Sequence, residues 1–323
     1  MINMLQIKDL VAGYEMRKKW VAAVDHVSLN VKKDDFLGLA GESGCGKSTL
    51  AFSIMGLLKK PGKIKSGSIL FKGKDLTKMN NEELRNTRWK DISMVFQSAM
   101  NSLNPVMRIG DQIVDSILAH KMVKKEKAYE RAKELLKLVN ISPDRVNSYP
   151  HQLSGGMKQR VMIAMALSLK PSLIIMDEPT TALDVVVQRM IIEEIGEIRE
   201  KLGFSILFIT HDLSLLVEIS KKIAIMYAGE IVEIANSQEL YSNPLHPYTY
   251  GLMSSFPTLV GPLKRSDGIP GRPPDLSQPI EGCRFYDRCS KRMDICRKRH
   301  PNLIDMGNNH MVACWLYSGD KNE

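Results

Sequence analysis

The segment Gly41–Thr49 (GESGCGKST) constrains this chain most, because it matches the phosphate-binding pattern G-x-x-x-x-G-K-[ST] at every fixed position. The apolar run FLGLA at 36–40 precedes it and predicts a short buried strand. The apolar residues that follow predict a helix over 50–58. A strand, a glycine loop and a helix N-terminus together aim backbone N–H groups at a polyphosphate. We therefore expect a nucleotide-binding site at this loop.

Individual residues of the loop have distinct expected roles. Gly44 and Gly46 let the backbone wrap closely, Lys47 reaches the β- and γ-phosphates, and Ser48 can ligate Mg²⁺. Cys45 occupies a variable position, where a small side chain fits. The residues of this segment expected to contact the nucleotide are Gly41, Ser43, Gly44, Cys45, Gly46, Lys47, Ser48 and Thr49.

A second signal is LIIMDE at 173–178, in which four apolar residues lead into two carboxylates. The apolar run predicts a fully buried parallel strand. Asp177 at its end is placed to hold the Mg²⁺ shell, and Glu178 to orient or deprotonate an attacking water. These two residues, with the loop, predict nucleotide hydrolysis.

A third signal is LSGGMKQR at 153–160, which precedes an amphipathic helix expected over 161–169. Ser154 is expected to cap that helix, while Gly155 and Gly156 leave its N-terminus open to an anion. A second phosphate-facing helix start beside a phosphate loop suggests a composite site. Here the chain resembles the ATP-binding-cassette (ABC) ATPases, whose signature motif is LSGGQ-like, with Met157 replacing the usual glutamine.

The resemblance implies an α/β P-loop NTPase fold of ABC type, with a parallel-sheet core, a helical signature subdomain and an antiparallel edge sheet. It also implies that Gln97 senses the γ-phosphate and the metal, that His211 contacts the γ-phosphate, and that 181–184 is the D-loop. Tyr14 resembles the aromatic residue that stacks on adenine, with Trp20 as the alternative ring. In this family the signature of one subunit closes over the ATP of another, so one cassette per chain implies a dimer.

The chain divides into an expected cassette at 1–245, with a helical insertion at about 98–160, and a small extension at 246–323. Pro244 and Pro247 mark the break, because neither can occupy a helix interior. Three segments from this break onward are HPYT at 246–249, IPGRPP at 269–274 and CRFYDRC at 283–289. They resemble the C-terminal extension of oligopeptide and dipeptide importer ATPases, in the peptide/nickel uptake branch.

This resemblance implies an ATP-hydrolysing subunit that powers import of dipeptides or oligopeptides from the cytoplasmic face of the membrane. Its implied partners are a second ABC ATPase subunit, identical or paralogous, two permease subunits and an extracytoplasmic peptide-binding protein. Dipeptides, longer peptides and nickel complexes all remain open as the transported solute, because the permease and binding protein select it.

Cys283, Cys289, Cys296 and Cys314 are spaced C-x5-C-x6-C-x17-C. Disulfides are not expected in a reducing compartment, and four thiols so close favour a soft metal. Zinc sites usually contain cysteine pairs two to four residues apart, and no such pair occurs here. The irregular spacing favours a [4Fe–4S] cluster, with zinc or unliganded thiols as alternatives. Some dipeptide-importer ATPases, which this extension resembles, carry this cysteine set.

Charge and composition limit the function classes. The net charge is +9, and 283–300 holds seven Lys/Arg and two Asp, an excess of 7 − 2 = +5 expected to offset an anionic metal centre. The longest apolar run, 161–169, is shorter than the roughly 18 residues of a membrane span, and no signal peptide is visible, so we expect a cytosolic protein. A competing hypothesis is an ABC protein acting on nucleic acid or ribosomes. Such proteins usually contain two cassettes, and the basic segment lacks interleaved aromatics, so we expect no nucleic-acid partner.

Overall fold

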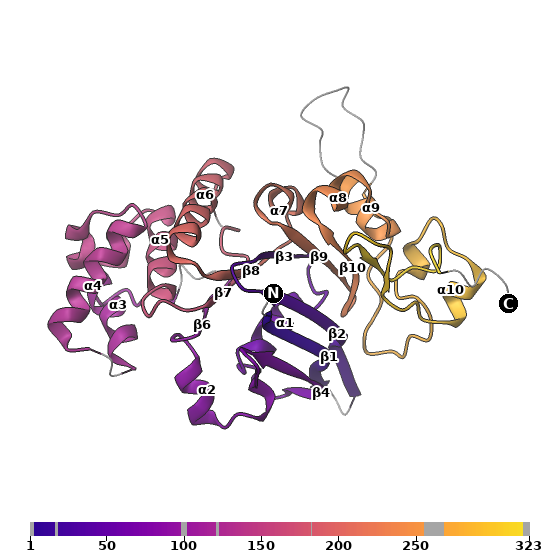
Figure 1. Cartoon of the computed structure of the whole chain (residues 1–323), viewed down its shortest axis with the longest axis horizontal. Helices are drawn as coiled ribbons and strands as arrows, with labels where there is room; N and C mark the ends of the chain where they lie inside the picture. The colour runs from indigo at the N-terminus through magenta and orange to yellow at the C-terminus, as the bar shows by residue number, and fades with distance from the viewer. Residues whose placement is uncertain are drawn as a thin grey trace. The chain divides into compact units, whose positions relative to one another are not determined.

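The computed structural model describes residues 3–16, 19–97, 102–120, 123–181, 183–254 and 268–318 (Figure 1). Parts of the expected helical insertion, of the D-loop and of the extension therefore lie outside the described residues. The chain forms two compact units, each described separately below. The first comprises Met1–Met4, Val31–Asp35 and Lys78–Phe208, and the second comprises Leu5–Asn30, Phe36–Thr77 and Ile209–Glu323.

The second unit contains a four-stranded sheet with the order β2-β1-β4-β5. Its strands are β1 (Asn3–Met16), β2 (Lys19–Lys32), β4 (Gly62–Phe71) and β5 (Lys74–Asp75). β1 pairs antiparallel with β4, from Leu5 opposite Phe71 to Tyr14 opposite Gly62. Val27, Leu29 and Val31 of β2 are buried and alternate with exposed residues, as expected of a strand with one covered face. The antiparallel sheet predicted from the family resemblance is therefore present.

A second set of strands in this unit has the order β11-β12-β10-β9-β3. Their bounds are Phe36–Ala40 for β3, Lys222–Tyr227 for β9, Glu230–Asn236 for β10, Ile304–Asp305 for β11 and Met311–Val312 for β12. β3 runs parallel to β9, and β12 of the C-terminal extension pairs antiparallel with β10. The extension thus adds strands to the same unit that carries the phosphate loop.

Short helices connect these strands. They are α1 (Lys47–Ile54), η1 (Leu76–Lys78), α7 (Leu213–Ile219), α8 (Ser237–Ser242), α9 (Pro247–Ser254), η5 (Tyr286–Arg288) and α10 (Asp294–Lys298). α9 begins at Pro247, where proline is tolerated because a first-turn N–H has no helical partner. α1 ends at Ile54 and not at Leu58, because Gly56 adopts a left-handed φ of 59° that terminates helical geometry.

The first unit contains β6 (Ile92–Val95) and β7 (Leu173–Asp177), which pair in parallel, and the chain leaves it along β8 (Ser205–Thr210) beside β7. Its helices are α2 (Asn81–Thr87), α3 (Ile109–Leu118), α4 (Lys125–Leu138), η3 (Pro143–Asn147), η4 (Pro150–Gln152), α5 (Gly155–Ala166) and α6 (Val185–Leu202). α3 and α4 pack on each other and on α5, which also contacts α6 (Figure 1).

The core follows the apolar runs read from the sequence. Every residue of β3, β7 and β8 is buried, which explains why these strands show no polar alternation. Within the described residues, no helix combines the length and apolar character needed to cross a bilayer.

Candidate nucleotide site and cysteine segment

The phosphate loop follows β3 and leads into α1. Gly46, the N-cap of α1, has a φ of 111°, and a Cβ there would lie 1.9 Å from the carbonyl oxygen of Ala23. Only glycine fits this turn. The N-cap provides no side-chain hydrogen bond, so the first N–H groups of α1 remain available to an anion.

Lys47 lies over the loop and is 5% exposed. Its Nζ donates to the carbonyl oxygens of Gly41 at 2.7 Å and Glu42 at 3.0 Å. Cys45 is buried, and burial raises the pKa of its thiol, as expected for a small packing residue. The loop therefore holds its lysine through its own backbone.

The acidic end of β7 brings three predicted residues together in the first unit. Asp177 is buried, and Glu178 follows it with a left-handed φ of 47°. The Glu178 carboxylate accepts hydrogen bonds from Gln97 Nε2 at 2.8 Å and from Thr181 Oγ1 at 3.2 Å. Such a backbone conformation is costly for a non-glycine residue and is found preferentially at functional sites.

The signature segment begins α5, six residues before the helix start predicted from the sequence. Ser154 Oγ accepts a hydrogen bond from the Met157 N–H at 3.3 Å, which confirms the predicted cap and allows two glycines in the first turn. Ser154 and Gly155 are exposed. A Cβ on Gly156 would lie 2.9 Å from Val187 Cγ1, so glycine permits close packing of α5 on α6.

His211 directly follows β8 and is exposed, and the next residue, Asp212, caps α7 through the Leu215 N–H at 3.2 Å. His211 and the phosphate loop belong to the second unit, whereas Gln97, Asp177, Glu178 and the signature belong to the first. The sequence-predicted residues are thus distributed over both compact units.

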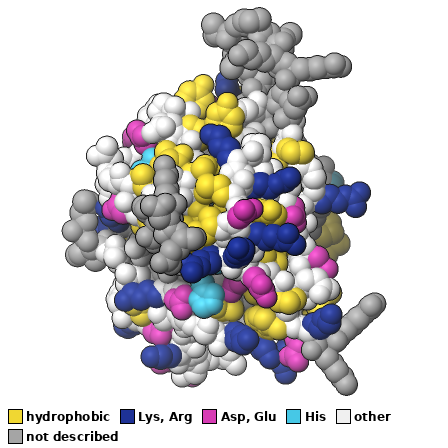
Figure 2. All heavy atoms as spheres, turned by 90° about the vertical axis from the view of Figure 1, so that its right-hand side faces the viewer, with side chains coloured by type: hydrophobic (Ala, Val, Ile, Leu, Met, Phe, Trp, Pro, Cys, Tyr) yellow, Lys and Arg dark blue, Asp and Glu magenta, His cyan; other side chains and the backbone are white. Residues whose placement is uncertain are grey.

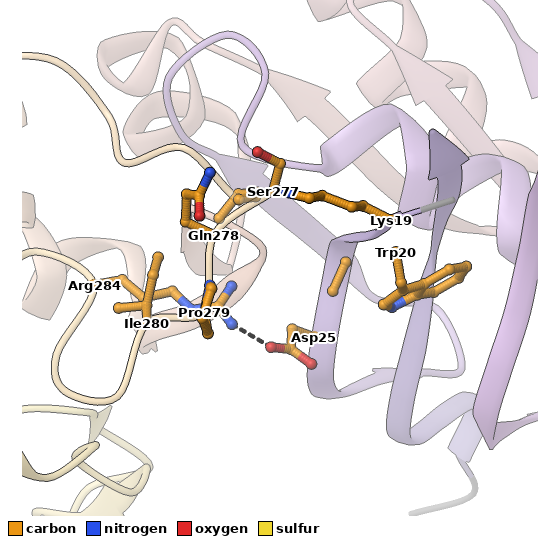
Figure 3. Close-up of a pocket in the computed structure, with 10 residues that line it drawn as sticks. Lys19, Trp20, Asp25, Ser277, Gln278, Pro279, Ile280 and Arg284 are labelled. Atoms are coloured by element: carbon orange, nitrogen blue, oxygen red, sulfur yellow. Dashed lines mark hydrogen bonds and ion pairs between the residues drawn. The ribbon is translucent and has the colours of Figure 1, made fainter. Parts of the chain in front are cut away.

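The two candidate adenine-stacking rings have different surroundings. Tyr14 on β1 contacts the start of α1, with its hydroxyl 3.3 Å from Thr49 Oγ1. Trp20 on β2 lies near the ammonium groups of Lys63 and Lys65, at 5.8 and 5.7 Å from the ring centroid. Trp20 also lines a cavity of about 540 Å³, which Figure 3 shows between β2 and residues of the extension. Tyr14 is therefore the ring in contact with the phosphate-loop segment.

The four cysteines of the extension are free thiols, and Cys296 and Cys314 are buried. Burial, with a smaller contribution from neighbouring cysteines, raises the pKa of Cys283 to about 12 and that of Cys314 to about 11. The backbone N–H two residues after Cys283, Cys289 and Cys314 donates to each sulfur and opposes this shift. Neighbouring cysteines therefore contribute to the raised pKa of Cys283, Cys289 and Cys314. Among the described residues, however, no group of three or more His, Cys, Asp or Glu side chains is arranged to hold a metal ion.

The basic residues around these cysteines fall into two groups. Arg284 and Arg288 are paired with carboxylates of the second unit. The other five are exposed: Lys291, Arg292, Arg297, Lys298 and Arg299. Lys291 and Arg292 lower the pKa of Cys289, although burial raises it more. Figure 2 shows Lys and Arg interspersed with Asp and Glu on the face that it draws.

Three residues at the loop were not identified as functional from the sequence: Glu42, Tyr248 and Arg288. The Arg288 guanidinium binds the Glu42 carboxylate through two hydrogen bonds of 2.7 and 2.8 Å, and the Tyr248 hydroxyl accepts the Glu42 N–H at 2.9 Å. HPYT and CRFYDRC contain Tyr248 and Arg288, but no pattern in the sequence links them to a glutamate more than 200 positions away.

Two family models match the chain. The ABC transporter model matches residues 24–181, and the model described as "Oligopeptide/dipeptide transporter, C-terminal region" matches residues 232–296. Among curated relatives, the oligopeptide transport ATP-binding protein OppD of Bacillus subtilis (strain 168) is 44% identical over 98% of this chain and 90% of its own length. The dipeptide transport ATP-binding protein DppD of Caldanaerobacter subterraneus subsp. tengcongensis is 42% identical over 97% of both chains.

Solved structures show the same cassette fold. The dimeric structure of MJ0796, a bacterial ABC transporter cassette, has a TM-score of 0.65 and 29% identity, and the alignment covers 72% of this chain and 99% of that one. The cassette cbiO1 from Clostridium perfringens also has a TM-score of 0.65, with 27% identity over 75% of this chain and 92% of its own. The fold class and the ATPase family predicted from the sequence are confirmed. The chain belongs to the ABC transporter family, in the group of ATP-binding proteins of oligopeptide and dipeptide transport.

Proposed function

We propose that the chain is the ATP-hydrolysing subunit of a membrane transporter that imports dipeptides or oligopeptides. The observation that carries this proposal is the combination of an intact cassette with the peptide-transporter C-terminal region in one chain. Curated relatives named for oligopeptide transport and for dipeptide transport align with it over 97–98% of its length. The proposal therefore keeps both peptide classes as substrates.

ATP binding is assigned to the phosphate loop and Tyr14. The free N–H groups at the start of α1 and the Lys47 ammonium suit a polyphosphate, and the position of Tyr14 beside Thr49 suits a ring that stacks on adenine. Ser48, Gln97 and Asp177 provide the hydroxyl, amide and carboxylate oxygens that Mg²⁺ prefers. Mg²⁺ bound with the nucleotide supplies neutralisation of charge on the transferring phosphoryl group.

Hydrolysis is assigned to Glu178. A water oxygen attacks the γ-phosphorus, the bond to the bridging oxygen breaks, ADP leaves, and the Glu178 carboxylate takes the water proton. The hydrogen bonds from Gln97 and Thr181 orient that carboxylate. His211 is assigned a contact to the γ-phosphate.

A second ABC ATPase subunit, identical or paralogous, is the proposed partner. Ser154 and Gly155 are exposed at the N-terminus of α5, where Gly156 packs against α6. α6 exposes three large apolar side chains, with exposed fractions of 70% at Val185, 68% at Val186 and 49% at Met190. An exposed helix start beside apolar side chains suits burial by another subunit. The remaining proposed partners are two permease subunits and an extracytoplasmic binding protein, which place the chain at the cytoplasmic face of the membrane.

We also propose that Cys283, Cys289, Cys296 and Cys314 bind a soft metal centre, a [4Fe–4S] cluster with zinc as the alternative. The neighbouring cysteines that raise the pKa of Cys283, Cys289 and Cys314, and the N–H donors to these three sulfurs, support this proposal. Such a centre would cross-link the extension. Protein purified without oxygen should contain about four irons per chain, whereas colourless protein with one zinc would contradict the cluster.

Peptide uptake tests the function. The transporter genes are expressed in cells that lack peptide uptake and need a dipeptide to supply one amino acid. Wild type should restore growth, and Glu178→Gln should not, although it still binds ATP. Glu200→Gln, an exposed carboxylate on α6, is the matched control and should behave as wild type. Growth with Glu178→Gln, or no uptake with wild type, would contradict the proposal.

A further inference from the structure

We propose that Arg288 of the C-terminal extension is a positioning residue for the phosphate loop. It holds the side chain of Glu42 and, through the backbone of Glu42, sets the position of Lys47. This inference deepens the proposed nucleotide site and rests on the role of Lys47 as the phosphate ligand.

Glu42 is the point at which the extension meets the loop. Its carboxylate accepts two hydrogen bonds from Arg288, and its N–H donates to the hydroxyl of Tyr248. Its carbonyl oxygen accepts the Lys47 ammonium at 3.0 Å. The backbone and side chain of Glu42 are thus fixed from two sides by the extension, and the same residue supports the phosphate lysine.

Arg288 is itself rigidly held. Its side chain is 5% exposed, and its Nε donates to the Pro270 carbonyl oxygen at 2.8 Å. The guanidinium also lies over the Tyr227 ring at 5.7 Å and within 3.3 Å of the Tyr227 hydroxyl. Two parallel hydrogen bonds from a planar guanidinium fix the orientation of a carboxylate, which one ammonium cannot do. Through these contacts, Arg288 couples the position of Glu42 in the phosphate loop to the position of the extension.

Arg284 provides an internal comparison, because it is also largely buried and also adjoins a cysteine of the segment. It pairs with Asp25 and Glu230, and Figure 3 shows its link to Asp25 on β2. Neither carboxylate belongs to the phosphate loop. A purely structural role would make the two arginines equivalent, whereas a positioning role distinguishes them.

The experiment measures Mg-ATP affinity, KM and kcat of the full-length chain for wild type, Arg288→Gln, Arg288→Lys and Arg284→Gln, with thermal unfolding for each. Arg288→Gln should weaken ATP binding and raise KM roughly tenfold or more, with a smaller change in kcat, because Glu42, whose carbonyl oxygen accepts the Lys47 ammonium, loses the anchor of its side chain. Arg288→Lys should recover part of this loss. Arg284→Gln should lower the unfolding temperature comparably but leave KM within about twofold of wild type.

If Arg288→Gln does not fold, a double-mutant cycle of Glu42→Gln and Arg288→Lys replaces it, and the two changes should be non-additive in ATP affinity. Unchanged ATP affinity in Arg288→Gln, equal losses in Arg284→Gln, or additive effects in the cycle would each overturn the inference. Wild-type protein that binds ATP but supports no peptide uptake would contradict the proposed function alone.

Discussion

Two helix starts in this molecule are rich in glycine, and they are built differently. α1 begins after Gly46 with no side-chain cap, and its lysine is held by a loop that the extension supports. α5 begins after Ser154, which caps it, and its first residues are exposed. The start of α1 is arranged to bind an anion, and the residues that support it belong to its own compact unit. The other is stable without an anion and open at the surface.

The difference suggests which half of a composite site each start provides. An uncapped N-terminus with buried support binds phosphate tightly but needs help to hold its shape. A capped, exposed N-terminus keeps its helix whether or not a ligand is present, so it can engage and release a nucleotide held elsewhere. This assignment agrees with the proposed dimer, in which each signature acts on the ATP of another subunit.

Lys47→Ala should have the largest effect on the phosphate-loop side. Because the ammonium is the loop's positive charge, we expect ATP affinity to fall roughly hundredfold, measured by titration with a fluorescent ATP analogue. The signature helix should be unaffected, and far-ultraviolet circular dichroism should match wild type. Retention of full ATP affinity would contradict the assignment of this loop to the nucleotide site.

Ser154→Asp tests the N-terminus of α5, and its expected effect is smaller than that of Lys47→Ala. Aspartate caps helices as well as serine, so α5 should remain folded, but its charge would repel a γ-phosphate. We expect hydrolysis to fall about tenfold, with the ATP affinity of the dilute, unassociated chain unchanged. Ser154→Asn is the matched control, because asparagine is a neutral capping residue of the same size as aspartate. Its hydrolysis rate should stay within about threefold of wild type. Equal rates for the two variants would argue against phosphate at this helix start.

Acidification should produce the smallest effect. It should lower folding stability through the contacts that support the phosphate loop. Burial lowers the pKa of His246 to about 4, and its neutral Nδ1 accepts the N–H of Tyr248, whose hydroxyl supports Glu42. Stability from this neutral ring is complete above the unfolded pKa of about 6.5 and is lost as the pH falls towards 4. The loss should be roughly 1 kcal/mol at pH 5.5.

Thermal unfolding between pH 7 and pH 4.5 measures this effect. His246→Asn, which keeps an acceptor but does not titrate, should show a shallower fall in unfolding temperature than wild type. Parallel curves for the two proteins would exclude His246 as a source of the acid sensitivity.

Local features of the fold were predictable because strong sequence patterns specify them. FLGLA became β3 with the expected bounds, since continuous burial leaves few alternatives. The start of α5 was placed too late, because Gly155 and Gly156 have poor helix propensity and only the Ser154 cap compensates. Motif spacing identified Gln97 and Glu178, which the structure brings into contact.

Long-range pairing was not predictable in the same way. From the sequence, the excess of +5 in 283–300, from seven Lys/Arg and two Asp, is expected to offset a metal centre. Two of those residues, Arg284 and Arg288, instead pair with Asp25, Glu230 and Glu42. Each partner is separated by more than 50 positions, and charge counts carry no information about which carboxylate an arginine meets.

The most direct test of the central claim follows ATP binding and ATP hydrolysis as the concentration of the chain, or of its partner subunits, is raised. ATP should bind even to the dilute chain, because the phosphate loop is complete within one chain. Its apparent affinity should rise as the subunits associate, because the signature of a second subunit adds contacts to the bound ATP. Hydrolysis per chain should rise with association, because the signature must come from a second subunit. A chain that sediments as a monomer while hydrolysing ATP at its full rate would contradict the account.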